Sequence, residues 1–229
     1  MTRSGLASLA LALAAVVVCA AVASAQSDQA ERIRACIAAF QDATASPDNA
    51  IPRSLLNRAE AVVVFPGTIK GGFIAGVHRG HGILSVRDPK TRQWSPPSFM
   101  TLTGGSFGAQ IGVSEVDIVL VVMNQRGIEN LLSNQFKVGA DVGIAAGPVG
   151  RDAEVATDIA MRAEILSYSH TRGVFAGATL KGTAITTDGD ANRIFYGREL
   201  TTRQIVFEGV GRTVDPVPEW IAFLTKVMP

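Results

Sequence analysis

Few residues of this chain have the types and the spacing that chemistry at a site requires. Gly104 to Gly108 matches the pattern G-x-S-x-G, which in hydrolases exposes a serine, here Ser106, on a turn between a strand and a helix. His170 and several aspartates follow in an order that a catalytic triad allows. The residues after Ser106, however, alternate as a strand does and carry further glycines, so no helix follows the turn. Hydrolysis at Ser106 is a minor alternative.

A second pattern is similar to a calcium-binding loop. Oxygen-bearing side chains occupy positions 1, 3, 5 and 12 of such a loop, namely Asp188, Asp190, Asn192 and Glu199. Arg193 stands where the loop needs a glycine for its sharp turn, and the preceding residues are typical of a strand. A polar hairpin turn is the favoured interpretation, and calcium binding stays open until a calcium titration decides it.

The histidines and cysteines do not form a metal site in the sequence. His78 and His81 are three residues apart, His170 is distant, and no Cys-x-x-Cys pair exists to complete a zinc site. Neither a phosphate-binding loop lysine nor a dinucleotide fingerprint is present. The sequence therefore predicts a protein that is not an enzyme and that has no catalytic metal and no cofactor.

Composition indicates one folded domain. The chain has 229 residues, of which 47% are hydrophobic and 18% charged, enough for a substantial core. Lys and Arg number 21 against 20 for Asp and Glu, so the molecule has no overall field that would attract nucleic acid. Any function that depends on charge must come from a local cluster.

The N-terminus predicts export. Arg3 precedes an apolar stretch from Leu6 to Val22, and Ala23-Ser24-Ala25 has the form of a signal-peptidase site. We expect a signal peptide at 1–25 and a periplasmic or secreted protein that is peripheral on a membrane. An uncleaved anchor helix and lipid attachment at Cys19 are the alternatives. After cleavage Cys36 stands alone, so no disulfide can form within the chain.

The sheet core is predicted to start at Thr101 to Asn124. Alternate residues from Phe107 to Val113 are apolar and the intervening positions are mainly glycine, which is a strand signal. Val116 to Met123 is apolar on both parities except at Asp117, as in a strand buried on both faces. Similar glycine spacing recurs along the chain, so we expect an α+β fold with a β-rich, largely antiparallel glycine-rich sheet and a few covering helices.

Further elements follow from periodicity and turn residues. A helix is predicted from Ser27 to Ala43 with Ile33, Cys36, Ile37 and Phe40 on its sheet side. The strands expected next are Ala61 to Phe65, Ile69 to His78 and His81 to Arg87, with a tight turn at Arg79-Gly80. Later predictions are a short helix from Gln125 to Gln135, a strand from Lys137 to Gly147, a hairpin of Met161–His170 with Gly173–Thr186, and a helix from Pro218 to Val227. Arg198 to Phe207 is ambiguous, and Gly209 is expected to end it.

Basic residues gather at strand ends and turns. A solvated rim is the ordinary interpretation, yet several of them converging beside Trp94 would hold a lipid phosphate while the indole ring lies at the membrane interface. The residues concerned are Lys70, Arg79, Arg87, Lys90, Arg92, Arg151, Arg172 and Lys181.

Ten short motifs in a fixed order give the chain a recognisable resemblance. They are Ala61–Pro66, Gly71–Phe73, Gly80–Gly82, Trp94–Pro97, Thr103–Gly105, Gly139–Asp141, Ala146–Arg151, Tyr168–Ser169, Gly173–Gly177 and Phe195–Gly197. The series resembles the SYLF domain family over roughly 55–209. Together with the export signal and the predicted helices, it divides the chain into 1–25, signal peptide; 26–54, N-terminal helical segment; 55–209, SYLF-like domain; and 210–229, C-terminal tail with a short helix.

The resemblance also implies a function. SYLF proteins bind phospholipid through an N-terminal helix and a basic surface; eukaryotic members bind phosphoinositides, and fungal ones bind actin filaments. In this chain that surface corresponds to Arg32, Arg34, Arg53, Arg58 and Lys70. The expected partner is an anionic phospholipid membrane surface, with actin unlikely because of export. The alternative is a structural or adaptor protein that binds an envelope protein through its sheet face.

Overall fold

The computed structural model describes residues 3–45, 50–72, 75–107, 112–133, 136–137, 143–149, 163–171, 174–177 and 183–229. Within these ranges only the backbone is described for 3–23, 70–72, 75–78, 105–107, 112–114, 136–137, 171 and 174–177. The predicted strands Lys137 to Gly147, Met161 to His170 and Gly173 to Thr186 are therefore described only in part, and the basic residues Arg151, Arg172 and Lys181 fall outside the described residues.

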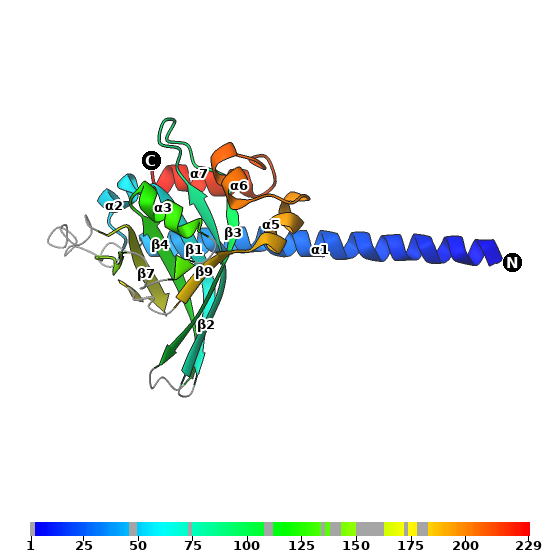
Figure 1. The fold of residues 1–229 in the computed structure, drawn as a ribbon, viewed down its shortest axis with the longest axis horizontal. Coiled ribbons are helices and arrows are strands. Elements are labelled where there is room, and N and C mark those ends of the chain that lie inside the picture. Colours follow the sequence, from blue (N-terminus) through cyan, green and yellow to red (C-terminus); the bar gives the residue numbers. More distant parts are fainter. Residues whose placement is uncertain are drawn as a thin grey trace.

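A nine-stranded sheet is the centre of the described fold (Figure 1). Its strands are β1 (Ala61–Gly72), β2 (Ala75–Val86), β3 (Ser98–Phe107), β4 (Gly112–Val122), β5 (Phe136–Lys137), β6 (Ile144–Ala146), β7 (Ile165–Thr171), β8 (Val174–Gly177) and β9 (Thr183–Thr187). The order across the sheet is β5-β9-β3-β2-β1-β4-β7-β6, and β8 pairs with β7. Every pairing is antiparallel except that of β6 with β7, so the predicted α+β class and largely antiparallel sheet are confirmed.

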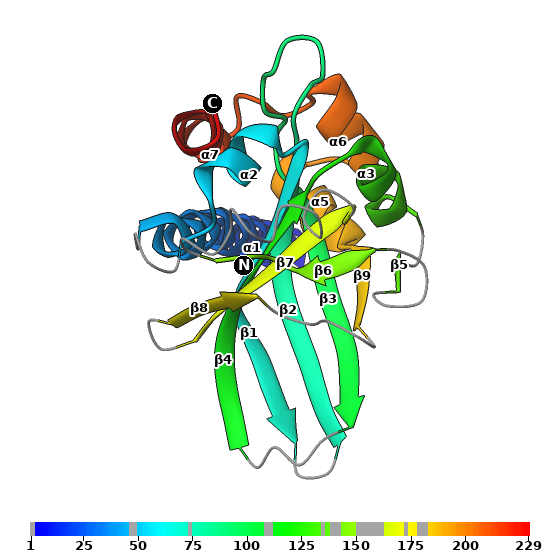
Figure 2. The same cartoon turned by 90° about the vertical axis from the view of Figure 1, so that its left-hand side faces the viewer.

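Six helices complete the described fold. They are α1 (Arg3–Ala45), α2 (Arg53–Arg58), α3 (Gln125–Leu131), α5 (Gly189–Tyr196), α6 (Thr202–Glu208) and α7 (Val217–Val227). In Figure 2, α1, α2 and α7 lie on one side of the central strands, and α3 and α6 lie on the other. The far ends of β1 to β4 extend beyond both helical layers. Within the described residues, no helix is both long and apolar enough to cross a membrane.

Strand alternation divides the buried side chains between two cores. Val62 and Val64 of β1 face the core under α1 and α7, whereas Val63 and Phe65 face the core under α3 and α6. β4 alternates in the same way, with all residues from 118 to 122 buried, because a strand places successive side chains on opposite faces. The prediction of a strand buried on both faces is therefore confirmed.

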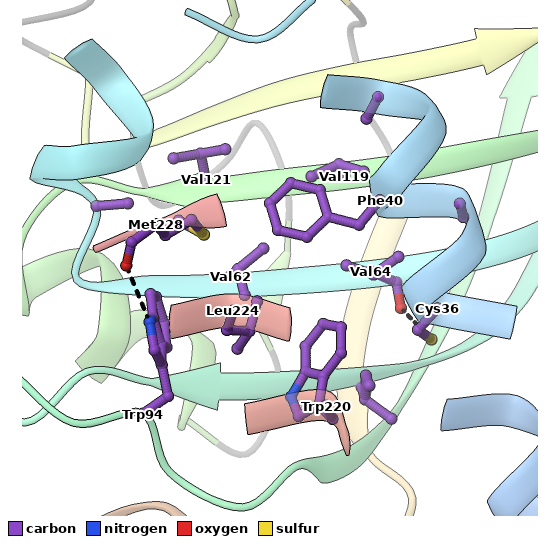
Figure 3. Close-up of a cluster of buried hydrophobic side chains, with 14 of the residues drawn as sticks. Cys36, Phe40, Val62, Val64, Trp94, Val119, Val121, Trp220, Leu224 and Met228 are labelled. Carbon is purple, nitrogen blue, oxygen red and sulfur yellow. Dashed lines mark hydrogen bonds between the residues drawn. The ribbon is translucent and has the colours of Figure 1, made fainter. Parts of the chain in front are cut away.

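Helix α1 supplies the central part of the first core (Figure 3). Ile33, Cys36 and Phe40 are fully buried, and Ile37 is partly buried, as the predicted stripe requires. The ring of Phe40 meets Phe223 of α7 edge to face at 5.9 Å between centroids. The helix runs from Arg3, however, instead of starting at Ser27, because the preceding residues are mostly strong helix formers and include no proline.

The predicted turn at Arg79-Gly80 is wrong. β2 is continuous through both residues, and Gly80 pairs with Leu102 of β3. A Cβ atom on Gly80 would lie 2.5 Å from the Thr68 hydroxyl of β1, so the glycine permits close approach of a neighbouring strand. The irregular position is instead Pro66-Gly67, where β1 has a register shift and Gly67 takes a φ of 54°.

Two later predictions also need correction. β7 and β8 pair as expected. β9, however, does not continue this hairpin: it lies beyond the four central strands in the same sheet, where it pairs with β3. Asp188 to Tyr196 is a capped helix and not the predicted polar hairpin turn, because the Asp188 side chain accepts a hydrogen bond from the Ala191 N–H at its first turn. The ambiguous segment contains α6, which ends at Gly209 as predicted, and α3 and α7 confirm the other two helices.

Candidate functional site: a basic corner beside helix α2

The short helix α2 ends at the centre of a cluster of arginines. The Leu56 carbonyl accepts from the N–H of Ala59, where the chain continues in an extended conformation, so later carbonyls of the helix need partners outside it. The Asn57 carbonyl oxygen accepts hydrogen bonds from Nη1 of Arg87 at 3.1 Å and from Nη2 of Arg92 at 2.9 Å. The two donor nitrogens are therefore at most 6.0 Å apart, the sum of the two bond lengths. Two cations thus converge on the negative end of one helix.

The side chain of Arg87 is buried beneath this cluster of arginines. It is only 2% exposed, donates a second hydrogen bond from Nη2 to the Met228 carbonyl, and stacks over the Trp94 ring at 4.5 Å. The indole Nε1 of Trp94 also donates to the Met228 carbonyl, at 3.3 Å (Figure 3). Burial, and secondarily the charge of Arg92, lower the pKa of Arg87 to about 10, so the group stays cationic at neutral pH.

The turn after β2 carries the exposed part of the cluster. Asp88 closes this turn, because its Oδ1 accepts from the backbone N–H groups of Thr91 at 2.7 Å and Lys90 at 2.8 Å. Those hydrogen bonds hold the pKa of the Asp88 carboxyl below its usual range. Arg92 follows with a left-handed φ of 60°, and the turn carries Lys90 and Arg92 exposed on the same loop.

Four exposed cations lack a carboxylate partner at this place. In the described part of the chain, no acidic oxygen lies within 4.0 Å of the charged nitrogens of any of them, whereas seven basic-to-acidic contacts are formed elsewhere. We call this set the basic corner: Arg53, Arg58, Lys90 and Arg92, with Arg87 buried beneath them. An unpaired set of cations on short, well-anchored elements is suited to bind a phosphate-bearing surface.

The structure separates the five residues that the family resemblance points to. Arg53 and Arg58 belong to the basic corner, at the two ends of α2. Arg32 and Arg34 lie on α1, and Lys70 lies on the extended part of β1, where only its backbone is described. In Figures 1 and 2 the far ends of the long strands point away from α2. The five residues therefore do not form one continuous site.

The arginines of α1 already have partners within the fold. Nη1 of Arg32 lies 3.2 Å from Oδ2 of Asp188, and the Arg32 guanidinium stacks over the Phe99 ring at 5.4 Å. Arg34 contacts Asp215 at 3.2 Å and Glu219 at 3.8 Å. These contacts attach α1 to α5 on one side and to the start of α7 on the other. The two side chains thus have a structural role that periodicity could not indicate.

The calcium pattern does not form a loop. Asp188 caps α5 and Asp190 pairs with Arg193 within it. Asn192 is buried, and its Oδ1 accepts from the Phe99 backbone N–H at 2.9 Å. Because these side chains belong to one helix and point to different partners, they do not converge on one cation. Among the described residues, no group of three or more metal-ligating side chains was found.

The other candidate groups have structural surroundings too. Ser106 is paired opposite Gly76 within β3, so the strand-to-helix turn of a hydrolase is not formed there. His170 contacts Asp117 at 3.4 Å across β7 and β4, and His81 contacts Asp188 at 3.5 Å. Cys36 is buried against the Val64 carbonyl, and this burial raises the pKa of its thiol far above its usual range.

Of the basic residues that were predicted to converge beside Trp94, Arg87 and Arg92 lie together there. Trp94 itself is 1% exposed, so its ring braces Arg87 and does not lie at a surface. Sequence reasoning missed the two acceptors, the carbonyls of Asn57 and Met228, because backbone oxygens carry no sequence signal.

Comparison with known proteins agrees with the sequence motifs. A family model described as "Las17-binding protein actin regulator", Ysc84, matches residues 103–228. The chain belongs to the SYLF, or Ysc84, family. The curated relatives include LAS seventeen-binding protein 3 of Saccharomyces cerevisiae, 32% identical over 162 residues that cover 69% of this chain and 35% of the relative.

Two further relatives extend the comparison. Protein YSC84 of the same yeast is 31% identical over 162 residues, covering 69% of this chain and 34% of the relative. The SH3 domain-containing YSC84-like protein 1 of Xenopus laevis is 30% identical over 171 residues, covering 74% and 50%. The chain thus spans between a third and a half of the length of these SYLF relatives.

Proposed function

We propose that this SYLF protein is a non-enzymatic module that binds anionic phospholipid at a membrane surface through its basic corner. The observation that supports this is the group of four exposed cations on α2 and on the turn after β2. None of them has a carboxylate partner within the described fold. Each cation near an anionic membrane contributes about 1 kcal/mol, so four together supply useful affinity without any inserted apolar residue.

The test is flotation of the protein with vesicles of phosphatidylcholine that contain increasing phosphatidylglycerol. Replacing Arg53, Arg58, Lys90 and Arg92 by Gln removes about 4 kcal/mol, which corresponds to roughly a thousandfold weaker association at low salt. Association of the wild-type protein should also fall as salt is raised, since surface charges are screened within about 10 Å at 0.1 M salt.

A matched control removes the same charge from other surfaces. The four exposed arginines Arg126, Arg193, Arg198 and Arg203 are changed to Gln, giving a variant with the same net charge. Association should remain close to wild type, because these arginines lie on α3, α5, α6 and the α5–α6 connection, and Figure 2 shows α3 and α6 on the other side of the central strands from α2. An equal loss of vesicle association in both variants would show that net charge, and not a local site, drives the binding. If the wild-type protein did not float at any lipid composition, lipid binding would be rejected.

The remaining residues of the family surface form a separate arm of the test. A variant with Arg32, Arg34 and Lys70 changed to Gln tests whether α1 and β1 also contact lipid. Since Arg32 and Arg34 are held by acidic side chains, we expect this variant to lose stability more than vesicle association. A large loss of association in a fully folded variant would assign lipid contact to α1 as well.

The proposed setting is an exported compartment, with the protein peripheral on a membrane. Export rests on the A-x-A site ending at Ala25, and the check is the mass of the protein recovered from the cell envelope, which should correspond to a chain beginning at Gln26. Relatives are described as Las17-binding and actin-regulating proteins, so a protein partner is the rival function. Saturable capture of a protein without any dependence on lipid would favour that rival.

A further inference from the structure

The buried Arg87 connects three elements that the basic corner needs. Its backbone N–H donates to the Glu60 carbonyl at 2.7 Å, just after α2, and Arg87 bridges to Trp94 across the turn. Its side chain reaches the end of α2 at Asn57 and the residue that follows α7, Met228. α2, the turn of residues 88–93 and the end of α7 are therefore held by one side chain.

We propose that Arg87 is the positioning residue of the basic corner: it fixes the end of α2 against the turn so that Arg58 and Arg92 are presented together to one anionic surface. This inference rests on the lipid-binding function proposed above. Arg87 itself would not touch lipid, because it is 2% exposed.

The shared acceptor explains how two like charges stay together. Arg92 reaches the same Asn57 oxygen as Arg87, with donor nitrogens at most 6.0 Å apart, although like charges repel at this distance. Without Arg87 the Asn57 carbonyl is no longer fixed from the inside, so Arg92 and the neighbouring Arg58 lose their common anchor. The position of both exposed charges thus depends on a residue that is itself buried.

The chemistry of the site accounts for an arginine at this place. A planar guanidinium can donate to two carbonyls in different directions while its flat face lies on an indole ring, which neither lysine nor a neutral amide can do at once. Nε of Arg87 has no hydrogen-bond partner, and no carboxylate within 4.0 Å balances its charge among the described residues. A brace that only stabilised the fold would not need this desolvated charge.

The experiment measures association with phosphatidylglycerol vesicles for Arg87→Met, for the double variant Arg58→Gln/Arg92→Gln, and for the triple variant. All measurements are made below the lowest melting temperature, with folding checked by circular dichroism. We expect Arg87→Met to weaken association about fivefold or more, the effect of losing one well-placed cation. The triple variant should bind no more weakly than the double variant, because nothing is then left to position.

Two further variants separate positioning from stability and from charge. Trp220→Phe, at a residue outside the basic corner, loses the indole hydrogen bond to the Ser85 hydroxyl, so it should lower the melting temperature and leave association unchanged. Arg87→Lys keeps the charge without the two-armed geometry, so it should bind weakly like Arg87→Met; it also serves if Arg87→Met fails to fold.

Several results would overturn the inference. Wild-type association in Arg87→Met, full recovery in Arg87→Lys, equal weakening in Trp220→Phe, or a further fivefold loss in the triple variant would each exclude a positioning role. Failure of lipid binding itself looks different, since the wild-type protein would then not float at all.

Discussion

Asp188 offers a sharp test of how the N-terminal helix is attached to the sheet. Its Oδ1 accepts from the Ala191 N–H at 3.1 Å and caps α5, while its Oδ2 lies 3.2 Å from Nη1 of Arg32 on α1. The two side chains are 17% and 19% exposed, so this ion pair is largely shielded from water. The cap and the ion pair therefore use different oxygens of one carboxylate, and Nδ1 of His81 also lies 3.5 Å from Oδ2.

The change Asp188→Asn removes the ion pair and keeps the cap, because asparagine caps helices about as well as aspartate. A hydrogen bond to a charged group contributes about 1.5–3 kcal/mol, so we expect a loss of about 2 kcal/mol in the free energy of unfolding. For a chain of this size that corresponds to a fall of about 4–8 °C in melting temperature. Asp188→Ala should lose about 1 kcal/mol more, because the cap also disappears.

The assay is urea unfolding of both variants, of Arg32→Gln, and of the double variant Arg32→Gln/Asp188→Asn. If the pair acts as described, the double variant is less destabilised than the sum of the single ones, with a coupling energy of about 1–2 kcal/mol. An Asp188→Asn protein as stable as wild type, or Asp188→Ala no worse than Asp188→Asn, would refute this account of the attachment.

Two further predictions concern the cores. Burial raises the pKa values of Tyr168 and Tyr196, whereas tyrosine in the unfolded chain has a pKa of about 10. The unfolded state therefore loses these protons first, and the free energy of unfolding should fall as pH rises above about 10. Denaturant titrations at several pH values should show a shallower fall for Tyr196→Phe. Trp220→Phe removes the 2.8 Å bond from Nε1 to the Ser85 hydroxyl and leaves that hydroxyl unsatisfied, which should cost about 1–3 kcal/mol in urea unfolding, and Trp220→Phe combined with Ser85→Ala should recover part of it.

Periodicity was enough to predict the elements whose burial is simple. The apolar run of β4 and the stripe of Ile33, Cys36 and Phe40 on α1 are local patterns, and both meet cores as expected. Gly209 also marks the end of α6 correctly. These predictions succeed because alternation and helical spacing follow from backbone geometry alone.

Turn-forming residues gave wrong predictions at two places where tertiary contacts determine the local structure. Arg79-Gly80 has the composition of a turn, yet strands on both sides bond to it, and the glycine makes room for Thr68. Asp188 to Asn192 has the composition of a polar turn, yet Asn192 is drawn into the core by the Phe99 backbone. In both cases partners from distant parts of the chain outweigh local propensity.

The sequence by itself determined the family, the α+β class and the presence of unusual basic residues near Trp94. It did not determine which arginines are available. Arg32 and Arg34 are joined to acids 156 and 181 residues away in the chain, whereas Arg53, Arg58 and Arg92 have no carboxylate within 4.0 Å in the described part of the chain. Charge is a property of composition, but its pairing depends on which segments the fold brings within about 4 Å, and only the tertiary structure decides that.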